Sequence, residues 1–395
     1  MEKQLMHYPE RVDLLESEGA FVVLAKAKKL EAEGKSIIHL QIGEPDFDTP
    51  PNICEAAIKA IRDGHTHYAP SGGIPAARKV VADYMSRTRG IDVGPEHSII
   101  MPGCKPVIFC SMLALISPGD EVIIPDPGYP TYRSVTNFLG AKPVTVKLRE
   151  ENNFRFSLRD VETAITTRTR MIILNSPHNP TGGILTHEDL EGVYTLAKKH
   201  DLWILSDEIY SRIIYDVAFQ SVGSVPGALE RTIMIDGMSK TYAMTGWRLG
   251  FGVMPKKLAD YMFTIAINNF SSTATFSQYA LIEALQGPQV AIDKMVEEFR
   301  SRRDIIVDGL NSIEGITCLR PEGAFYVFPN ITGTGLTSQE FADLMLEQAG
   351  VAGLAGTAFG RHGEGYIRLS YANSAENIRK AVALLKQALA GVRKA

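Results

Sequence analysis

The chain has 395 residues, of which 45% are apolar and 22% are charged, as is typical of a globular protein with two or three domains. Its net charge of -4 gives no electrostatic reason for binding nucleic acid or an anionic membrane. Its four cysteines form no CxxC pair, and residues Met1–Gln4 begin no apolar signal segment. We therefore expect a reduced protein in the cytoplasm.

Short apolar runs alternate with longer amphipathic stretches through the middle of the chain. A helix over residues 21–30 and a strand over residues 36–40 come first. Seven apolar runs then predict strands, at Ser98–Met101, Glu121–Ile124, Pro143–Val146, Met171–Leu174, Leu202–Leu205, Thr232–Ile235 and Leu249–Val253. Helical patterns separate them, which predicts an α/β fold with a mostly parallel sheet covered on both faces. The last run leads directly into Pro255, which suggests one antiparallel strand.

The far end of the chain lacks this alternation. A helix over residues 291–312 is followed by strands over 324–328 and 366–370 and by a helix over 375–392. We expect an N-terminal arm and part of a small domain at 1–47, a large domain at 48–288, and the rest of the small α/β domain at 289–395. The basic run over residues 300–303 is interpreted as a solvated helix face.

Lys240 follows the strand Thr232–Ile235, within the segment Ser239-Lys240-Thr241-Tyr242. Desolvation at such a strand end lowers the pKa of an amine, and the neutral amine is a nucleophile that can form a Schiff base. Arg248 lies eight residues further on and is suited to a phosphate. A nucleophilic amine next to a phosphate-binding cation points to pyridoxal phosphate (PLP) as cofactor.

Asp207 lies at the carboxyl end of the strand Leu202–Leu205, the edge at which open α/β sheets bind ligands. A carboxylate there can pair with a pyridinium nitrogen and keep the ring an electron sink. Alternatively, Asp207 caps the next helix. Tyr210 would face the same side of a helical turn and reach the phenolic oxygen of the ring.

Three loops that follow strands carry further candidates. The rigid turn around Pro177 and Pro180 would orient the Asn179 amide towards a cofactor oxygen or a substrate carboxylate. Gly103, Cys104 and Lys105 open a helix, where main-chain N–H groups form an anion site. Tyr129 could lie flat on a planar ring. No GxGxxG motif occurs, which argues against a nicotinamide enzyme, and no metal-ligand cluster is apparent.

Together these segments resemble the class I/II aminotransferases, the fold-type-I PLP enzymes, in the same order along nearly the whole chain. The resemblance rests on three segments: Gly237-Met238-Ser239-Lys240 through Gly246-Trp247-Arg248-Leu249-Gly250, Asn179-Pro180-Thr181-Gly182 and Ser206-Asp207-Glu208-Ile209-Tyr210. The resemblance is strongest to the bacterial aspartate aminotransferase-like subgroup. It implies the fold-type-I architecture and PLP as the cofactor.

The resemblance assigns roles to the candidates. Lys240 would hold the cofactor covalently and move a proton, with Asp207 on the ring nitrogen and with Tyr210 and Asn179 on the ring oxygen. Cofactor contacts would come from Gly103, Cys104, Lys105, Tyr129, Ser239 and Arg248. Substrate contacts would come from Gly43 and Arg368, with Arg368 clamping the α-carboxylate. Tyr68 would reach the phosphate of a neighbouring subunit, so a homodimer with shared active sites is implied.

Three positions bear on these roles. Lys105 matches a lysine that meets the distal carboxylate of the substrate in aspartate-type relatives, whereas Ala20 stands where those relatives carry a hydroxyl residue. Gly237 replaces a phosphate-binding serine of some relatives. We predict ping-pong transamination from an L-amino acid to a 2-oxo acid, such as 2-oxoglutarate, with aspartate or broad specificity. A PLP-dependent lyase or decarboxylase and a non-catalytic PLP-binding regulator are the alternatives.

Overall fold

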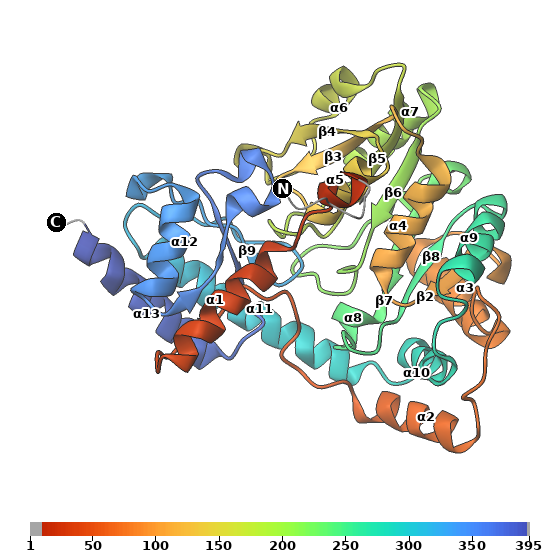
Figure 1. Ribbon diagram of the computed structural model, residues 1–395, viewed down its shortest axis with the longest axis horizontal. Coiled ribbons are helices and arrows are strands. Elements are labelled where there is room, and N and C mark those ends of the chain that lie inside the picture. The colour runs from red at the N-terminus through yellow and green to blue at the C-terminus, as the bar shows by residue number, and fades with distance from the viewer. Residues whose placement is uncertain (1–9, 393–395) are drawn as a thin grey trace, which may run out of the picture.

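The computed structural model describes residues 10–392 and folds them into two lobes around a seven-stranded sheet (Figure 1). The Met1–Gln4 segment lies outside the described residues. The order of the strands across the sheet is β2-β8-β7-β6-β5-β3-β4. Their bounds are Ser98–Met101 (β2), Glu121–Asp126 (β3), Lys142–Lys147 (β4), Thr169–Asn175 (β5), Trp203–Asp207 (β6), Thr232–Gly237 (β7) and Gly250–Val253 (β8).

All seven predicted strands of this sheet are confirmed, and β8 is its antiparallel strand, since it runs against both β2 and β7. The side chains alternate between the two faces of the sheet because the strand period is two. In β5, Met171 and Ile173 pack on one face, while Ile172 and Leu174 pack on the other. Both faces are therefore buried, which explains why these strands are continuous apolar runs.

Helices cover both faces of the sheet (Figure 1). On one face the apolar core includes side chains from α4 (Cys104–Leu115), α5 (Pro130–Phe138) and α9 (Lys256–Asn269). The opposite face packs against a different set: α3 (Pro75–Arg89), α6 (Leu158–Ala164), α7 (His187–Lys199) and α10 (Thr275–Gln286). The helix α2 (Pro51–Arg62) packs against α10, and the short helix α8 (Met238–Thr241) follows β7. The predicted helix over 187–200 begins as expected, with Thr186 and Asp189 forming a capping box.

The second lobe contains segments from both ends of the chain. Its helices are α1 (Gly19–Ala32), α11 (Val290–Asn311), α12 (Ser338–Glu347) and α13 (Ala375–Val392). Its strands are short: β1 (Ile38–His39), β9 (Tyr326–Val327), β10 (Val351–Ala352), β11 (Leu354–Ala355) and β12 (Ile367–Ser370). The strand β1 pairs in parallel with β10, and β12 lies between β11 and β9.

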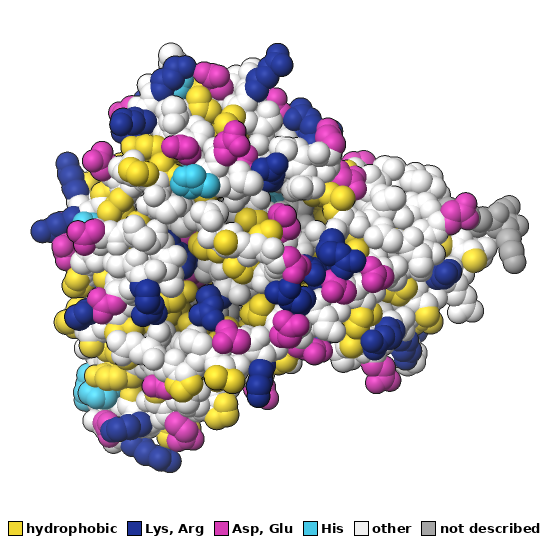
Figure 2. Space-filling model, turned by 180° about the vertical axis from the view of Figure 1, so that it is seen from behind, with side chains coloured by type: hydrophobic (Ala, Val, Ile, Leu, Met, Phe, Trp, Pro, Cys, Tyr) yellow, Lys and Arg dark blue, Asp and Glu magenta, His cyan; other side chains and the backbone are white. Residues whose placement is uncertain are grey.

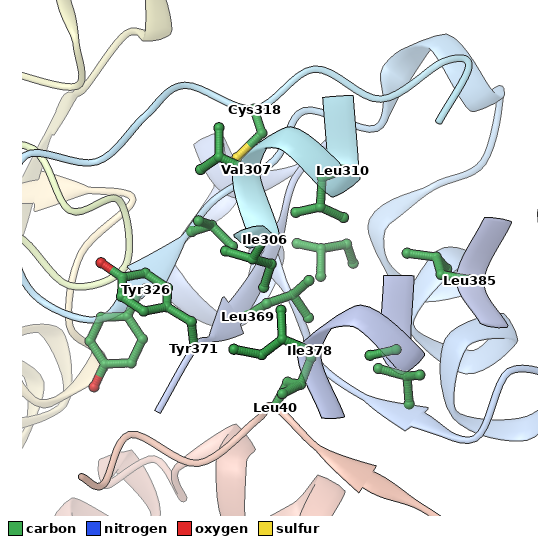
Figure 3. Packing of buried hydrophobic residues seen from close by; sticks show 14 of the residues in the cluster. Leu40, Ile306, Val307, Leu310, Cys318, Tyr326, Leu369, Tyr371, Ile378 and Leu385 are labelled. Carbon is green, nitrogen blue, oxygen red and sulfur yellow. The ribbon is translucent and has the colours of Figure 1, made fainter. Parts of the chain in front are cut away.

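Figure 3 shows the apolar core of this lobe, where Leu40 from the N-terminal part lies among Ile306, Leu369 and Ile378. The core joins segments that are more than 260 residues apart in sequence, and it also includes Ile213 from the loop after β6. The strands of this lobe are too short to be stable alone, so their packing against this core must stabilise them.

The interpretation of the basic run over 300–303 as a solvated face is wrong for two of its arginines. Arg302 and Arg303 are buried on α11, where Arg302 pairs with Asp46 and Arg303 with Asp216. Elsewhere on the surface, basic and acidic side chains are interspersed over the face shown in Figure 2. Within residues 10–392, every helix is too short or too polar to be a candidate membrane span.

Candidate active site

A cavity of about 510 Å³ opens beside the carboxyl ends of β5, β6 and β7, and residues of both lobes line it. The structure brings eleven of the predicted site residues to its wall. They are Gly43, Cys104, Lys105, Tyr129, Asn179, Asp207, Tyr210, Ser239, Lys240, Arg248 and Arg368. Gly103 lies directly behind the wall, whereas Tyr68 is 90% exposed and lies outside this cavity.

The amine of Lys240 reaches into the cavity from α8, the short helix that follows β7. Its Nζ atom donates a hydrogen bond of 2.6 Å to the main-chain oxygen of Gly43. Burial disfavours the charged form and lowers the pKa of Lys240 to about 8, although the nearby Glu44 carboxylate opposes this shift. A substantial fraction of this amine is therefore neutral near physiological pH, as a nucleophile requires.

Asp207 ends β6 and is buried, so its environment raises its pKa to about 6. Its Oδ2 atom accepts a 2.8 Å hydrogen bond from the hydroxyl of Tyr132, and its Oδ1 atom accepts from the main-chain N–H of Ile209. No helix starts here, because residues 209–212 form turns. The alternative interpretation of Asp207 as a helix cap is therefore wrong. The expected helical turn under Tyr210 is also absent, yet Tyr210 lines the cavity.

A buried ion cluster lies at the ends of β6 and β7, the two strands that lead to Asp207 and Lys240. Arg89, the last residue of α3, donates from Nε to Glu208 over 3.0 Å and from Nη2 to Asp236 over 2.6 Å. Glu208 follows Asp207, and Asp236 precedes the lysine segment, so one guanidinium connects the ends of β6 and β7. The cluster fixes the spacing between the strand ends that carry Asp207 and Lys240. No local sequence pattern identifies Arg89 as part of the site, because it lies more than 100 residues from either partner.

The start of α4 forms a cradle for an anion. Gly103 has a φ of 100°, which an L-residue rarely adopts, and a Cβ atom there would clash with the Arg248 guanidinium. Arg248 itself has a φ of 54° and donates hydrogen bonds to the main-chain oxygens of Thr245 and Pro102. Such backbone strain at a non-glycine residue is retained mainly at functional positions. The Arg248 guanidinium therefore lies against the start of α4, and a helix start with a cation beside it is suited to binding an anion.

The side chain of Cys104 explains why position 237, a serine in some relatives, is a glycine in this chain. A Cβ atom at Gly237 would lie 2.7 Å from the Cys104 sulfur and 2.9 Å from the Cα atom of Gly250. Cys104 Sγ also contacts the main-chain oxygen of Asp236. The cysteine side chain therefore occupies the space that a side chain at position 237 would need.

Arg368 extends from β12 and is buried. Its Nη1 atom donates to Asn179 Oδ1 over 3.1 Å, and its Nη2 atom donates to the main-chain oxygen of Gln41 over 2.6 Å. Its Nε atom is buried without a hydrogen-bond partner, and its two hydrogen bonds go to neutral oxygens of an amide and the main chain. A buried guanidinium that has an unused donor is suited to binding a carboxylate from a ligand.

Tyr326 from β9 holds several of these groups in place and was not anticipated from the sequence. Its ring lies 4.5 Å from the guanidinium carbon of Arg368, and its hydroxyl is 2.8 Å from that of Tyr210. A side chain at position 43 would clash with the Tyr326 hydroxyl, which explains the glycine there. Burial raises the pKa of Tyr210 well above its ordinary value, so this phenol stays protonated and can donate a hydrogen bond.

Lys105 and Tyr129 both contact Glu18, a residue that sequence analysis did not select. Glu18 Oε1 accepts a 2.9 Å hydrogen bond from the Tyr129 hydroxyl and forms an ion pair with Lys105. Burial tends to raise the pKa of Glu18, but the hydrogen bond and charge of Lys105 more than offset this, so the pKa is lowered. Glu18 is therefore ionised at neutral pH.

The sequence and the structure of the chain were compared with those of known proteins. The model of the family "Aminotransferase class I and II" matches residues 35–385. An aspartate aminotransferase of Pyrococcus horikoshii is 42% identical over 392 residues, which is 99% of each chain. The aromatic-amino-acid aminotransferase 2 of Thermococcus litoralis is 42% identical over 90% of this chain and 92% of its own length. The structure of aspartate aminotransferase from Thermus thermophilus with maleate superposes with a TM-score of 0.94, at 37% identity, over 97% of this chain and 100% of that chain.

Proposed function

The chain belongs to the class I and II aminotransferases, and from this premise we propose that its cavity moves the amino group of an L-amino acid to a 2-oxo acid in two successive half-reactions. The family is PLP-dependent, and the chain is similar to both aspartate and aromatic aminotransferases. The proposed specificity is broad and includes aspartate, with 2-oxoglutarate as the first acceptor to test.

The residues of the cavity fit PLP. Arg248, Ser239 and the N–H groups of Gly103, Cys104 and Lys105 would hold the phosphate, and Tyr129 would lie against the ring. Asp207, buried and without a cation beside it in residues 10–392, would bind the protonated ring nitrogen. Asn179 and Tyr210 would donate to the ring oxygen. When bound, PLP supplies a carbonyl for Schiff-base formation and an electron-withdrawing ring.

The single observation that carries the proposal is the buried Arg368 guanidinium in the cavity of Lys240. Arg368 would bind the α-carboxylate through two parallel N–H donors, with Asn179 and the main chain of Gly43 beside it. Such a clamp fixes the direction of the Cα–H bond relative to the ring plane, which decides the bond that breaks. The Lys240 amine, with a pKa of about 8, would act as the general base that takes the Cα proton of the substrate and then as the acid that gives the proton up again.

A homodimer is part of the proposal. Tyr68 is 90% exposed and does not line the cavity of its own subunit. A tyrosine this exposed is unusual unless it meets a partner. We assign it to the phosphate of the neighbouring subunit's cofactor.

The decisive experiment mixes the purified PLP-loaded protein with single L-amino acids and follows the absorption spectrum and the products. We expect conversion to the pyridoxamine form with release of one oxo acid per site, and recovery of the PLP form when 2-oxoglutarate is added. Lys240→Ala should retain the cofactor but lose turnover. Release of ammonia, a thiol or carbon dioxide in place of amino transfer would instead indicate a lyase or decarboxylase, and full activity of Lys240→Ala would contradict the mechanism.

A further inference from the structure

The cavity wall carries an ion pair whose position bears on substrate choice. Lys105, the cation that could attract the distal carboxylate of an acidic substrate, already pairs with Glu18. The Glu18 carboxylate also accepts the Tyr129 hydroxyl, and the Lys105 ammonium lies 5.8 Å from the centre of the Tyr129 ring. Of the two side chains, Glu18 is 26% exposed and Lys105 is 49% exposed. The protein itself thus supplies the carboxylate that an acidic substrate would bring.

The main chain around Glu18 is held in place from the large-sheet lobe. The short 3-10 helix η1 (Glu10–Leu14) packs against α5, and it is the short red helix beside the α5 label in Figure 1. Two residues before Glu18, both carboxylate oxygens of Glu16 accept hydrogen bonds from Arg133, and its main-chain N–H donates to Ser134. Glu18 itself is the N-cap residue of α1, but its side chain forms no hydrogen bond to the helix start. Its side chain is therefore free to serve the cavity.

Room exists for Glu18 to move. A second cavity, also of about 510 Å³, shares Glu18, Phe21 and Lys105 with the first. The ion pair therefore separates the two spaces, and a carboxylate that left Lys105 could turn towards the outer one. A partly exposed pair of this kind is weak and exchangeable, because solvent screens its attraction.

Resting on the proposed aminotransferase function, we propose that Glu18 is a specificity-determining residue that makes the enzyme prefer substrates with uncharged side chains. With such a substrate, Glu18 stays on Lys105 and the end of the cavity is electrically neutral. An acidic substrate binds only when its distal carboxylate displaces Glu18 from Lys105. The apolar side chains of Phe21, Ile42 and Ile108 in the same wall suit an uncharged or aromatic side chain.

The test compares aspartate with phenylalanine in single-turnover reactions of the PLP-loaded protein, for the wild type and for Glu18→Gln. The amide keeps the size of the side chain and an acceptor for Tyr129 but removes the charge. We expect the ratio of kcat/KM for aspartate to that for phenylalanine to rise about tenfold, mostly through KM, because Lys105 no longer has to be released from a partly screened ion pair with Glu18. Binding of maleate, an unreactive dicarboxylate, should tighten by a similar factor.

Two further variants isolate the effect. Glu33→Gln removes an exposed carboxylate at the end of α1, away from the cavity, so the substrate ratio should not change. In a Lys105→Met background, Glu18→Gln should no longer favour aspartate, because the freed cation is missing. An unchanged or lower ratio in Glu18→Gln, or a gain that persists without Lys105, would overturn the inference. If the wild type converts neither donor, the proposed function itself fails, whereas conversion of both with a fixed ratio contradicts only the role of Glu18.

Discussion

Among single residues, Lys240 permits a test of how burial tunes reactivity. Its pKa is about 8 because burial disfavours the ammonium form. Only the neutral amine attacks a carbonyl, so the rate at which the cofactor-free protein takes up PLP should rise about tenfold per pH unit below pH 8. Above pH 8 the rate should level off, which rapid-mixing absorbance measurements between pH 6 and 10 would detect. A rate that keeps rising to pH 10 would show that Lys240 titrates like a solvated lysine.

Arg368 permits a second test at the same scale. Arg368→Ala should lower kcat/KM for amino donors at least about 100-fold, the loss expected for one bidentate, buried ionic contact. The effect should appear mainly in KM, while PLP affinity stays close to that of the wild type, because Arg368 is assigned to the substrate alone. Arg170→Ala is the matched control, since Arg170 is half-exposed and pairs with Asp120 away from the cavity. Equal loss of PLP binding and substrate binding would contradict this division of roles.

The site residues that the sequence predicts follow strand ends, whereas those that it does not predict reach the site through packing of distant segments. Lys240, Asp207 and Asn179 follow strand ends, and local pattern alone predicts that such positions share one edge of a sheet. Tyr132, Tyr326 and Glu18 reach the site through packing between distant segments, for which no local spacing exists. Their contacts span 75 to 116 residues in sequence. The geometry places the predicted residues around one cavity, and their individual roles stay predictions.

At the scale of elements, the strands were predicted well and the connections less well. The seven apolar runs became β2 to β8 because burial on both faces selects such runs whatever their neighbours. The segment after β6 was expected to turn into a helix. Instead, the N–H of Glu208 bonds to Ile235 of β7, and the Glu208 side chain accepts from Ser206 and Ser221. The bonds to Ile235 and Ser221 join separated segments, and they replace the helix that the local pattern favoured.

The Arg89 cluster predicts how strongly α3 supports the ends of β6 and β7. Arg89→Met would leave the Glu208 and Asp236 carboxylates buried without a cation, which typically costs about 3–5 kcal/mol of unfolding free energy. Urea unfolding followed by circular dichroism would measure this loss. Arg149→Met is the control, because solvent screens the partly exposed Arg149–Asp160 pair and its loss should change the unfolding free energy far less. Similar stabilities for both variants would show that the cluster is not a structural support.

At the scale of the whole molecule, the site depends on two lobes that the chain builds from separated segments. The lobe of the large sheet carries Asp207 on β6 and Lys240 on α8, while the second lobe carries Arg368 on β12. Division of the chain at 47/48 and 288/289 stays a prediction. The apolar core of the second lobe also takes in Ile209, Ile213 and Tyr215, from the middle of the chain. A sequence-based boundary assigns these residues to the large domain, because burial against a distant helix leaves no trace in local composition.

The proposed dimer leads to a prediction that only a shared site can fulfil. Lys240→Ala abolishes turnover in its own subunit, and Tyr68→Ala should weaken PLP binding in the partner subunit. When the two variants are mixed, unfolded and refolded together, each hybrid dimer regains one site with an intact Lys240 and an intact Tyr68. With random pairing, about a quarter of all sites should then be fully competent at a PLP concentration that leaves Tyr68→Ala alone largely empty. If Tyr68 served its own subunit, or if the protein were a monomer, the mixture would be no more active than the average of its two components.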